Sequence, residues 1–95
     1  MIVLLAASYI DAIEKITDTS VIRKADNAFE KLKVANSLDD VANVIKPMHG
    51  YPSLYRLRFG DFRIGFRLID KNTIKLVYIK HRSKFYRYFP ANFVG

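Results

Sequence analysis

The residues with the clearest capacity for chemistry are arginines in an alternating segment, LYRLRFGDFRIGFRL, at residues 54–68. A Gly-Asp pair divides this segment into two runs, which is typical of a hairpin with a two-residue type II′ turn. Such a turn fixes the pairing, so that Arg58 faces Arg63 and Arg56 faces Gly65. Three arginines would then share one small surface.

Directly opposed arginines destabilise a sheet, so this pattern indicates that an anion binds between them. Gly65 strengthens this interpretation, because a missing side chain in mid-strand leaves room for a ligand or another backbone to approach. The alternative is that the arginines form only the solvated side of a one-sided sheet, with their alkyl stems lying over neighbouring residues.

The segment KHRSKFYRYFP, residues 80–90, adds four basic residues, a histidine and two tyrosines. Aromatic and basic residues interleaved in this way are typical of stacking on bases combined with contact to phosphates. His81 suits proton transfer near neutral pH, although a histidine at a strand end also commonly hydrogen-bonds a neighbour. Arg82 and Tyr86 are four residues apart and would share one side of a helical turn.

A second turn decides whether this tail joins the arginines. If it closes at residues 71–72, Arg63 also faces Lys80, and His81 and Arg82 lie at the edge of the arginine surface. A three-residue turn would reverse that assignment.

Composition excludes several kinds of chemistry. The chain has no cysteine and two histidines, which excludes disulfides, thiolate metal sites and a cysteine nucleophile and makes a zinc site unexpected. His49, beside a proline and a glycine, is expected to be a loop residue. No carboxylate pair is evident, so we expect no metal-dependent nuclease site.

The charge is concentrated in one half of the chain. Of the net charge of +7, residues 51–95 hold ten Lys/Arg against two Asp/Glu, whereas residues 1–50 are nearly balanced. A one-sided positive field suits a polyanion, and we favour nucleic acid over lipid. The apolar opening, residues 1–7, lacks a basic flank and fits neither a signal peptide nor a membrane span, so we expect a cytoplasmic protein without membrane contact.

These residues must be positioned by short elements. Residues 1–5 predict a strand, Tyr9, Ile13 and Ile16 predict an amphipathic helix, and residues 22–36 predict a second helix capped from residues 18–20.

The next segments connect these helices to the strands. Ser37 and Asp40 resemble a capping box for one further turn, and residues 47–53 predict a connection. Three alternating runs follow as antiparallel strands, and in the tail Phe85 and Phe89 are expected to pack inward.

The predicted fold is α+β and forms one small domain, residues 1–95. Two N-terminal helices would pack on a twisted, mainly antiparallel sheet of three to four strands, with a short C-terminal helical tail.

The order of these elements, with the motifs HGYPSLYRLRFGDFRIGFRL and KHRSKFYRYFP, resembles the RelE/ParE superfamily of type II toxin-antitoxin toxins. The similarity covers nearly the whole chain and is greatest to the RelE-like branch, in the central hairpin and a C-terminal "HR...YR.FP" signature. It implies a small ribonuclease that cuts messenger RNA in the ribosomal A site without a metal or other cofactor.

The resemblance also implies roles for individual residues. The catalytic candidates it implies are Arg63, His81, Arg82 and Tyr86. The RNA-binding candidates are Arg56, Arg58, Arg67, Lys80, Lys84 and Arg87. In this scheme a 2′-hydroxyl attacks the adjacent phosphate, Tyr86 or His81 takes the proton, and Arg63 with Arg82 balances the developing charge.

The partners implied by the resemblance are messenger RNA, the ribosome and a cognate antitoxin with an acidic, partly disordered segment, and operator DNA only through the antitoxin complex. Two other functions are possible for these residues: a ParE-like inhibitor of DNA gyrase, and a non-catalytic module that binds RNA or the ribosome. The full set of cationic and aromatic residues argues against the gyrase function, since a gyrase binder needs no phosphate site.

Overall fold

A mixed sheet of five strands forms the centre of the protein, in the order β1-β5-β4-β3-β2. The computed structural model describes residues 1–94. The strands are β1 (Ile2–Leu5), β2 (Ile45–Pro47), β3 (Leu54–Phe59), β4 (Phe62–Asp70) and β5 (Thr73–His81). The helices are α1 (Ala7–Glu14), α2 (Thr19–Val34) and α3 (Arg82–Tyr88), with short 3-10 turns η1 (Leu38–Val41) and η2 (Ala91–Phe93).

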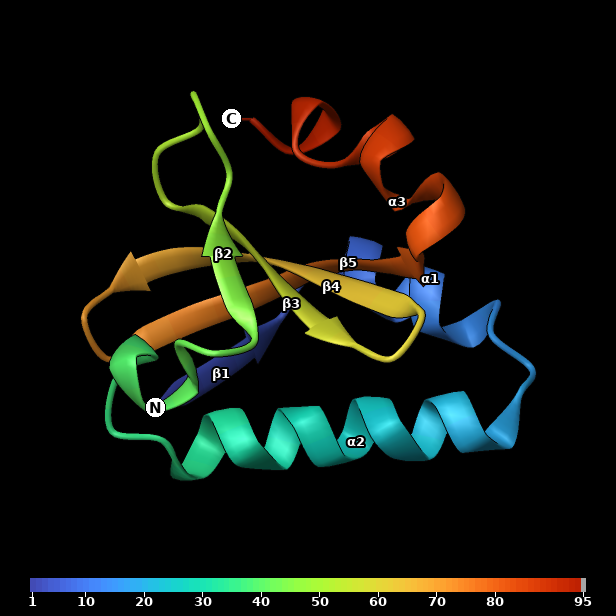
Figure 1. Ribbon diagram of the computed structural model, residues 1–95, viewed down its shortest axis with the longest axis horizontal. Coiled ribbons are helices and arrows are strands. Elements are labelled where there is room, and N and C mark those ends of the chain that lie inside the picture. Colours follow the sequence, from blue (N-terminus) through green and yellow to red (C-terminus); the bar gives the residue numbers. More distant parts are fainter. Residues whose placement is uncertain (95) are drawn as a thin grey trace.

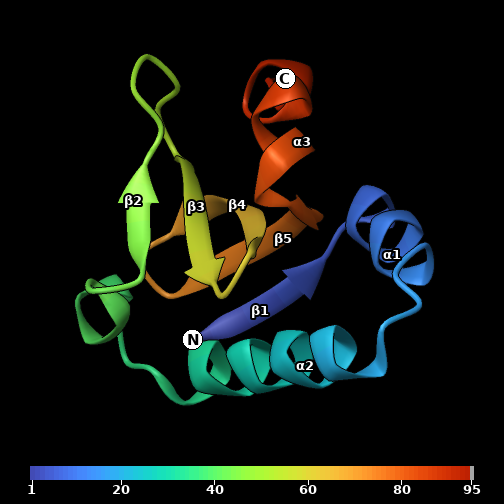
Figure 2. The same cartoon turned by 45° about the vertical axis from the view of Figure 1, so that its right-hand side comes forward.

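Helices cover both faces of this sheet. α2 lies below the sheet and α3 above it, while α1 lies beside β5 (Figures 1 and 2). The α2 face holds the larger core, in which Ala25 and Leu32 of the helix join Ile64 and Phe66 of β4. The α3 face holds a smaller core, made by Leu54, Val77, Phe85 and Phe89. The predicted α+β class with two N-terminal helices and a helical tail is confirmed.

α2 forms where its pattern predicts it. Asp18 caps the helix, since its carboxylate accepts a hydrogen bond from the Ser20 backbone N–H at 2.9 Å. Hydrogen bonds from the Ser20 hydroxyl and from the Ser20 backbone N–H lower the pKa of Asp18 below its ordinary value. Ala25, Ala28 and Leu32 then recur on one buried stripe.

The sheet has more strands than predicted. Residues 45–47 form the short strand β2, which pairs antiparallel with β3 through Ile45 opposite Leu57 and Pro47 opposite Tyr55. Pro47 is tolerated because β2 is an edge strand, where a missing N–H leaves no ladder partner unpaired. The predicted strand at the N-terminus is also present, as β1, and it runs parallel to β5.

The predicted capping box is wrong in detail. The Asp40 carboxylate accepts the Asn36 N–H at 2.8 Å, and the Ser37 side chain makes no cap hydrogen bond. The turn that follows is the 3-10 turn η1.

No helix within residues 1–94 is long and apolar enough to cross a membrane. Gly95, the last residue of the expected domain, lies outside the described residues.

Candidate RNA-binding site on the arginine-bearing face

The central hairpin has the predicted register. Arg58 lies opposite Arg63, and Arg56 lies opposite Gly65. Gly60 has a φ of 55°, whereas Asp61 is not among the residues with positive φ, which is the combination of a type II′ turn. Gly65 shares the hairpin face of these arginines and lies against Phe89, so the arginines project from the sheet face that carries α3.

The hairpin turn holds the Arg63 side chain. Its Nη1 donates hydrogen bonds of 2.9 Å to the backbone oxygens of Gly60 and Phe62. Its Nε is buried and has no hydrogen-bond partner within the described chain. A buried N–H without a partner is costly, so the guanidinium is held in place with unused hydrogen-bonding capacity.

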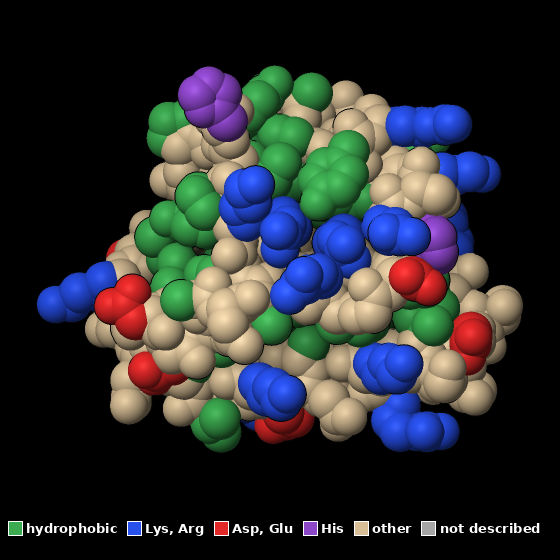
Figure 3. Space-filling view, viewed as in Figure 1, with side chains coloured by type: hydrophobic (Ala, Val, Ile, Leu, Met, Phe, Trp, Pro, Cys, Tyr) green, Lys and Arg blue, Asp and Glu red, His purple; other side chains and the backbone are tan. Residues whose placement is uncertain are grey.

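A fourth cation joins the arginines from β2. Lys46 lies directly opposite Arg56, and Arg56 Nη1 donates to the Val44 carbonyl at 3.2 Å. We call Lys46, Arg56, Arg58 and Arg63 the arginine cluster. Figure 3 shows Lys and Arg side chains gathered across the middle of this face, between α3 and α2. Sequence reasoning missed Lys46 because β2 was not predicted.

Gly65 has a different role from the one expected. A Cβ atom on Gly65 would lie 2.5 Å from Cε1 of Phe89, whose ring is fully buried. The space above Gly65 is therefore filled by the protein's own tail, so the expectation that it admits a ligand is wrong. The glycine instead lets α3 and the residues after it pack closely on the sheet.

Two predicted RNA-binding residues contact the tail. Arg67 Nη2 donates a hydrogen bond to the Phe93 carbonyl, and the Lys80 ammonium lies 5.8 Å from the centre of the Tyr88 ring. Lys80 faces Arg63 across the strands, as the two-residue turn predicts. Lys80 also lines a groove of about 480 Å³ between α1 and β5, beyond the arginine cluster.

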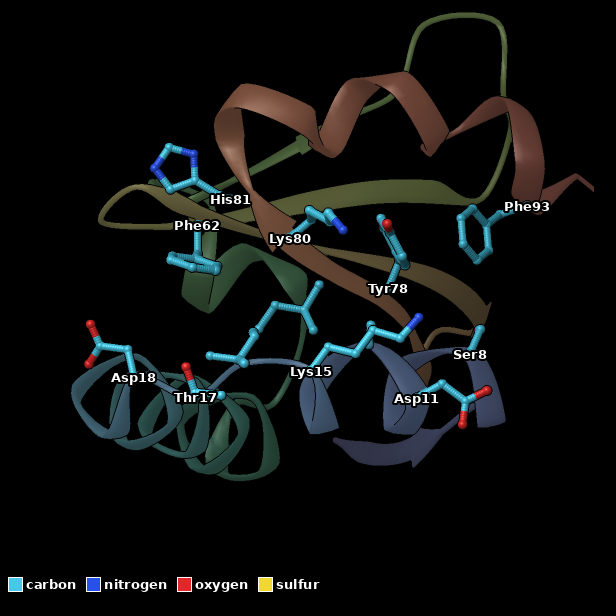
Figure 4. A pocket seen from close by; sticks show the side chains of 13 residues that line it. Ser8, Asp11, Lys15, Thr17, Asp18, Phe62, Tyr78, Lys80, His81 and Phe93 are labelled. Atoms are coloured by element: carbon cyan, nitrogen blue, oxygen red, sulfur yellow. The ribbon is translucent and has the colours of Figure 1, made fainter.

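His81 also lines this groove, close to Phe62 (Figure 4). It pairs with Phe62 across the strands, and the two rings meet edge to face at 5.4 Å. Its Nδ1 accepts the Ser83 backbone N–H at 3.1 Å, so His81 caps α3. The register and the cap place His81 beside the groove, opposite Phe62 and not opposite an arginine.

The remaining candidates lie on exposed parts of α3. Arg82 donates its backbone N–H to the Asp61 carbonyl at 2.7 Å, and its Nε lies 3.7 Å from the Asp61 carboxylate. This exposed ion pair contributes little to stability, and it ties the start of α3 to the hairpin turn. Tyr86 is half exposed and packs edge to face on Phe85. Lys84 and Arg87 are exposed.

The chemistry that this surface supports is contact with anions. Across residues 1–94 no group of three or more His, Asp or Glu side chains is placed to hold a metal ion. The cluster offers guanidinium groups, which bind phosphate oxygens in a fixed fork geometry. Exposed aromatic side chains on α3 provide surfaces on which bases could stack.

No protein-family model matches the chain. The chain is 39% identical over 61 residues to the toxin RelE3 of Methanocaldococcus jannaschii, a match that covers 64% of this chain and 68% of that protein. The chain belongs to the RelE toxin family. This membership agrees with the resemblance to the family in the motifs of the central hairpin and the C-terminal tail.

Solved structures of RelE-family complexes share the fold. A chain of the RelB-RelE antitoxin-toxin complex from Methanococcus jannaschii is 27% identical, with a TM-score of 0.72 over 92% of this chain and 99% of that one. A chain of the toxin-antitoxin complex RelBE2 from Mycobacterium tuberculosis is 19% identical, with a TM-score of 0.66 over 85% and 96%. The second likeness shows the fold alone.

In this RelE-family toxin the candidate residues fall into three groups. Arg56, Arg58 and Arg63 lie together in the arginine cluster. Four candidates lie on α3, namely Arg82, Lys84, Tyr86 and Arg87, and Arg82 is joined to the hairpin turn. The third group consists of Arg67, Lys80 and His81. Arg67 and Lys80 contact the C-terminal tail, and Lys80 and His81 line the groove between α1 and β5.

Proposed function

We propose that this RelE-family toxin is an endoribonuclease that cleaves messenger RNA and so inhibits translation. The observation that carries the proposal is the arginine cluster, in which Arg58 and Arg63 are held directly opposite each other with no acidic residue paired to either within residues 1–94. A purely structural sheet would avoid this repulsion, and a bound phosphate would relieve it.

The proposed reaction uses the RNA's own nucleophile. The 2′-oxygen attacks the adjacent phosphorus, the bond from phosphorus to the 5′-oxygen breaks, and the proton lost by the 2′-hydroxyl is balanced by one gained by the leaving oxygen. The products are a 2′,3′-cyclic phosphate and a 5′-hydroxyl. Arg63 would stabilise the charge on the phosphorane, with Arg82 as a second cation.

The α3 cap favours Tyr86 over His81 as the proposed base. Because His81 Nδ1 accepts the Ser83 N–H, the neutral ring carries its proton on Nε2. In that tautomer the Nδ1 lone pair is used by the Ser83 N–H and Nε2 already carries a hydrogen. We therefore assign the base to Tyr86, whose ring is half exposed on α3.

The partners proposed for this chain are messenger RNA on the ribosome and a cognate antitoxin, in the cytoplasm. The antitoxin is proposed because chains in RelB-RelE complexes share this fold. An acidic, partly disordered segment of the antitoxin would neutralise the arginine cluster. We also propose that residues 1–95 act as one toxin domain.

Primer extension on a translated messenger tests the proposal. The wild type and Arg63→Ala are induced briefly in a bacterial host, with Arg23→Ala as a control that removes an exposed arginine of α2. New 5′ ends inside the reading frame are expected with the wild type and with Arg23→Ala, and not with Arg63→Ala.

Other outcomes would point to other functions. Growth arrest with intact messenger would contradict ribonuclease action, and an assay of DNA supercoiling would then test inhibition of gyrase. RNA binding without cleavage or arrest would indicate a non-catalytic binding module.

A further inference from the structure

A second groove lies beside the arginine cluster, between α2 and the end of β3. It has a volume of about 220 Å³ and a polar rim formed by Lys24, Asn27 and Lys31 of α2 and by Arg58 of β3. Its floor includes the apolar side chains of Leu32 and Leu57. No acidic residue lines it.

The cations on the α2 side are arranged along one ridge. Lys24 and Lys31 are seven residues apart, which places them on the same side of the helix at a spacing of about 10 Å. Asn27 lies between them, and all three are exposed. Ammonium and amide groups spaced along a ridge are typical of contacts to a phosphate backbone.

Within residues 1–94 these cations have no ion-pair partner. Within the described residues the ion pairs join Lys33 to Glu30 and Arg82 to Asp61, and neither involves a residue of the groove. The sequence hides this positive surface, because residues 1–50 are nearly neutral in total. Folding separates the lysines of one side of α2 from the acidic residues of the same helix.

Arg58 connects the groove to the arginine cluster. Arg58 follows the last residue of β3 that pairs with β2, Leu57, and its backbone N–H donates to the Val44 carbonyl at 2.8 Å, which leaves its exposed side chain free. It faces Arg63 in the hairpin and also lines the groove. Figure 3 shows Lys and Arg side chains both in the middle of this face and on α2 below it.

We propose that this groove binds the phosphate backbone of single-stranded RNA that continues from the arginine cluster across the β3 edge onto α2. The inference rests on the proposed function, since it extends the RNA contact beyond the reacting phosphate. The RNA is either the messenger itself, beside the cleavage site, or a strand of ribosomal RNA, and both present the same phosphate chemistry. An acidic peptide is less well supported, because the connection through Arg58 leads to the proposed RNA site.

The test compares two double variants that each remove two positive charges from α2. Lys24→Gln with Lys31→Gln alters the groove, whereas Arg23→Gln with Lys33→Gln alters α2 outside it. The probe is a fluorescent single-stranded RNA with 2′-O-methyl sugars, which has no free 2′-hydroxyl to attack the phosphate. It is used in a short form that spans only the arginine cluster and in a long form that also reaches the groove. Anisotropy titrations over a range of salt concentrations give the affinity and its salt dependence.

If the messenger occupies the groove, the groove variant loses about tenfold or more in affinity for the long RNA at about 0.1 M salt, and the slope of log K against log salt falls by about 1.4. The short RNA and the control variant change much less. A loss confined to ribosome co-sedimentation, with the long RNA unaffected, would assign the groove to ribosomal RNA and also support the proposal.

Equal losses in both variants would show that only net charge matters and would overturn the proposal. So would wild-type protein that binds neither RNA nor ribosomes. If the groove variant binds RNA and ribosomes as the wild type does but no longer binds poly-glutamate, the groove is assigned to an acidic peptide. This result would also contradict the proposal. Cleavage by the same proteins is measured separately, so groove-dependent binding without cleavage would contradict the proposed function alone.

Discussion

The ring of Phe89 occupies the space directly above Gly65, where a Cβ atom would lie 2.5 Å from Phe89 Cε1. This contact holds the C-terminal tail on the face that carries the arginine cluster. Phe89 is fully buried and Gly65 is buried, so a side chain at position 65 would have to displace the ring.

Gly65→Ala is therefore expected to destabilise the fold by about 1–3 kcal/mol through overpacking. Urea unfolding followed by circular dichroism measures the change. Phe89→Leu in the same chain should recover part of the loss, because the smaller side chain makes room for the new methyl group. A loss in the double variant equal to the sum of the single losses would contradict the close contact.

The variant Arg63→Lys separates the effect of the positive charge of Arg63 from the effect of its planar guanidinium. Lysine keeps the positive charge and lacks the planar fork that donates to the Gly60 and Phe62 oxygens. We expect the cleavage rate to fall by about 100-fold, with RNA affinity reduced much less. Single-turnover cleavage and anisotropy measure the two effects. Cleavage within a few-fold of wild type would show that Arg63 acts only as a point charge.

His81 provides a test of capping against proton transfer. Asparagine is a good helix cap and does not titrate near neutral pH, so His81→Asn should preserve α3 and keep cleavage close to that of the wild type. His81→Ala should lose about 1 kcal/mol of stability with the cap. If His81→Asn instead abolishes cleavage while its stability is unchanged, then His81 takes part in the chemistry.

Tyr9 makes stability depend on pH in the alkaline range. Burial, together with the nearby negative charge of Asp26, raises the pKa of Tyr9 from 10.0 to about 12. Above pH 10 the unfolded chain loses this proton while the folded protein keeps it, so stability falls as pH rises from about 10 to about 12.

Urea midpoints measured across this range should fall less steeply for Tyr9→Phe than for the wild type. Tyr55→Phe is the control, because that ring is only half buried. The same slope in the wild type and in Tyr9→Phe would show that Tyr9 does not set the alkaline dependence.

The sequence alone determined the local features of this protein. The Gly60–Asp61 turn set the pairing of Arg58 with Arg63, because a two-residue loop leaves one register available. Helical spacing located α2, and the inward packing of Phe85 and Phe89 followed from the pattern of the tail. The family resemblance came from these same segments.

Tertiary structure decided which distant segments meet. The position of Phe89 over Gly65, the pairing of β2 with the β3 edge, and the groove between α2 and β3 all depend on packing between residues far apart in the chain. Local propensity carries no information about such contacts, because each depends on how whole elements bury their apolar faces against one another. For that reason the sequence indicated an arginine surface, and only the fold showed that the tail covers part of it and that Lys24 and Lys31 extend it.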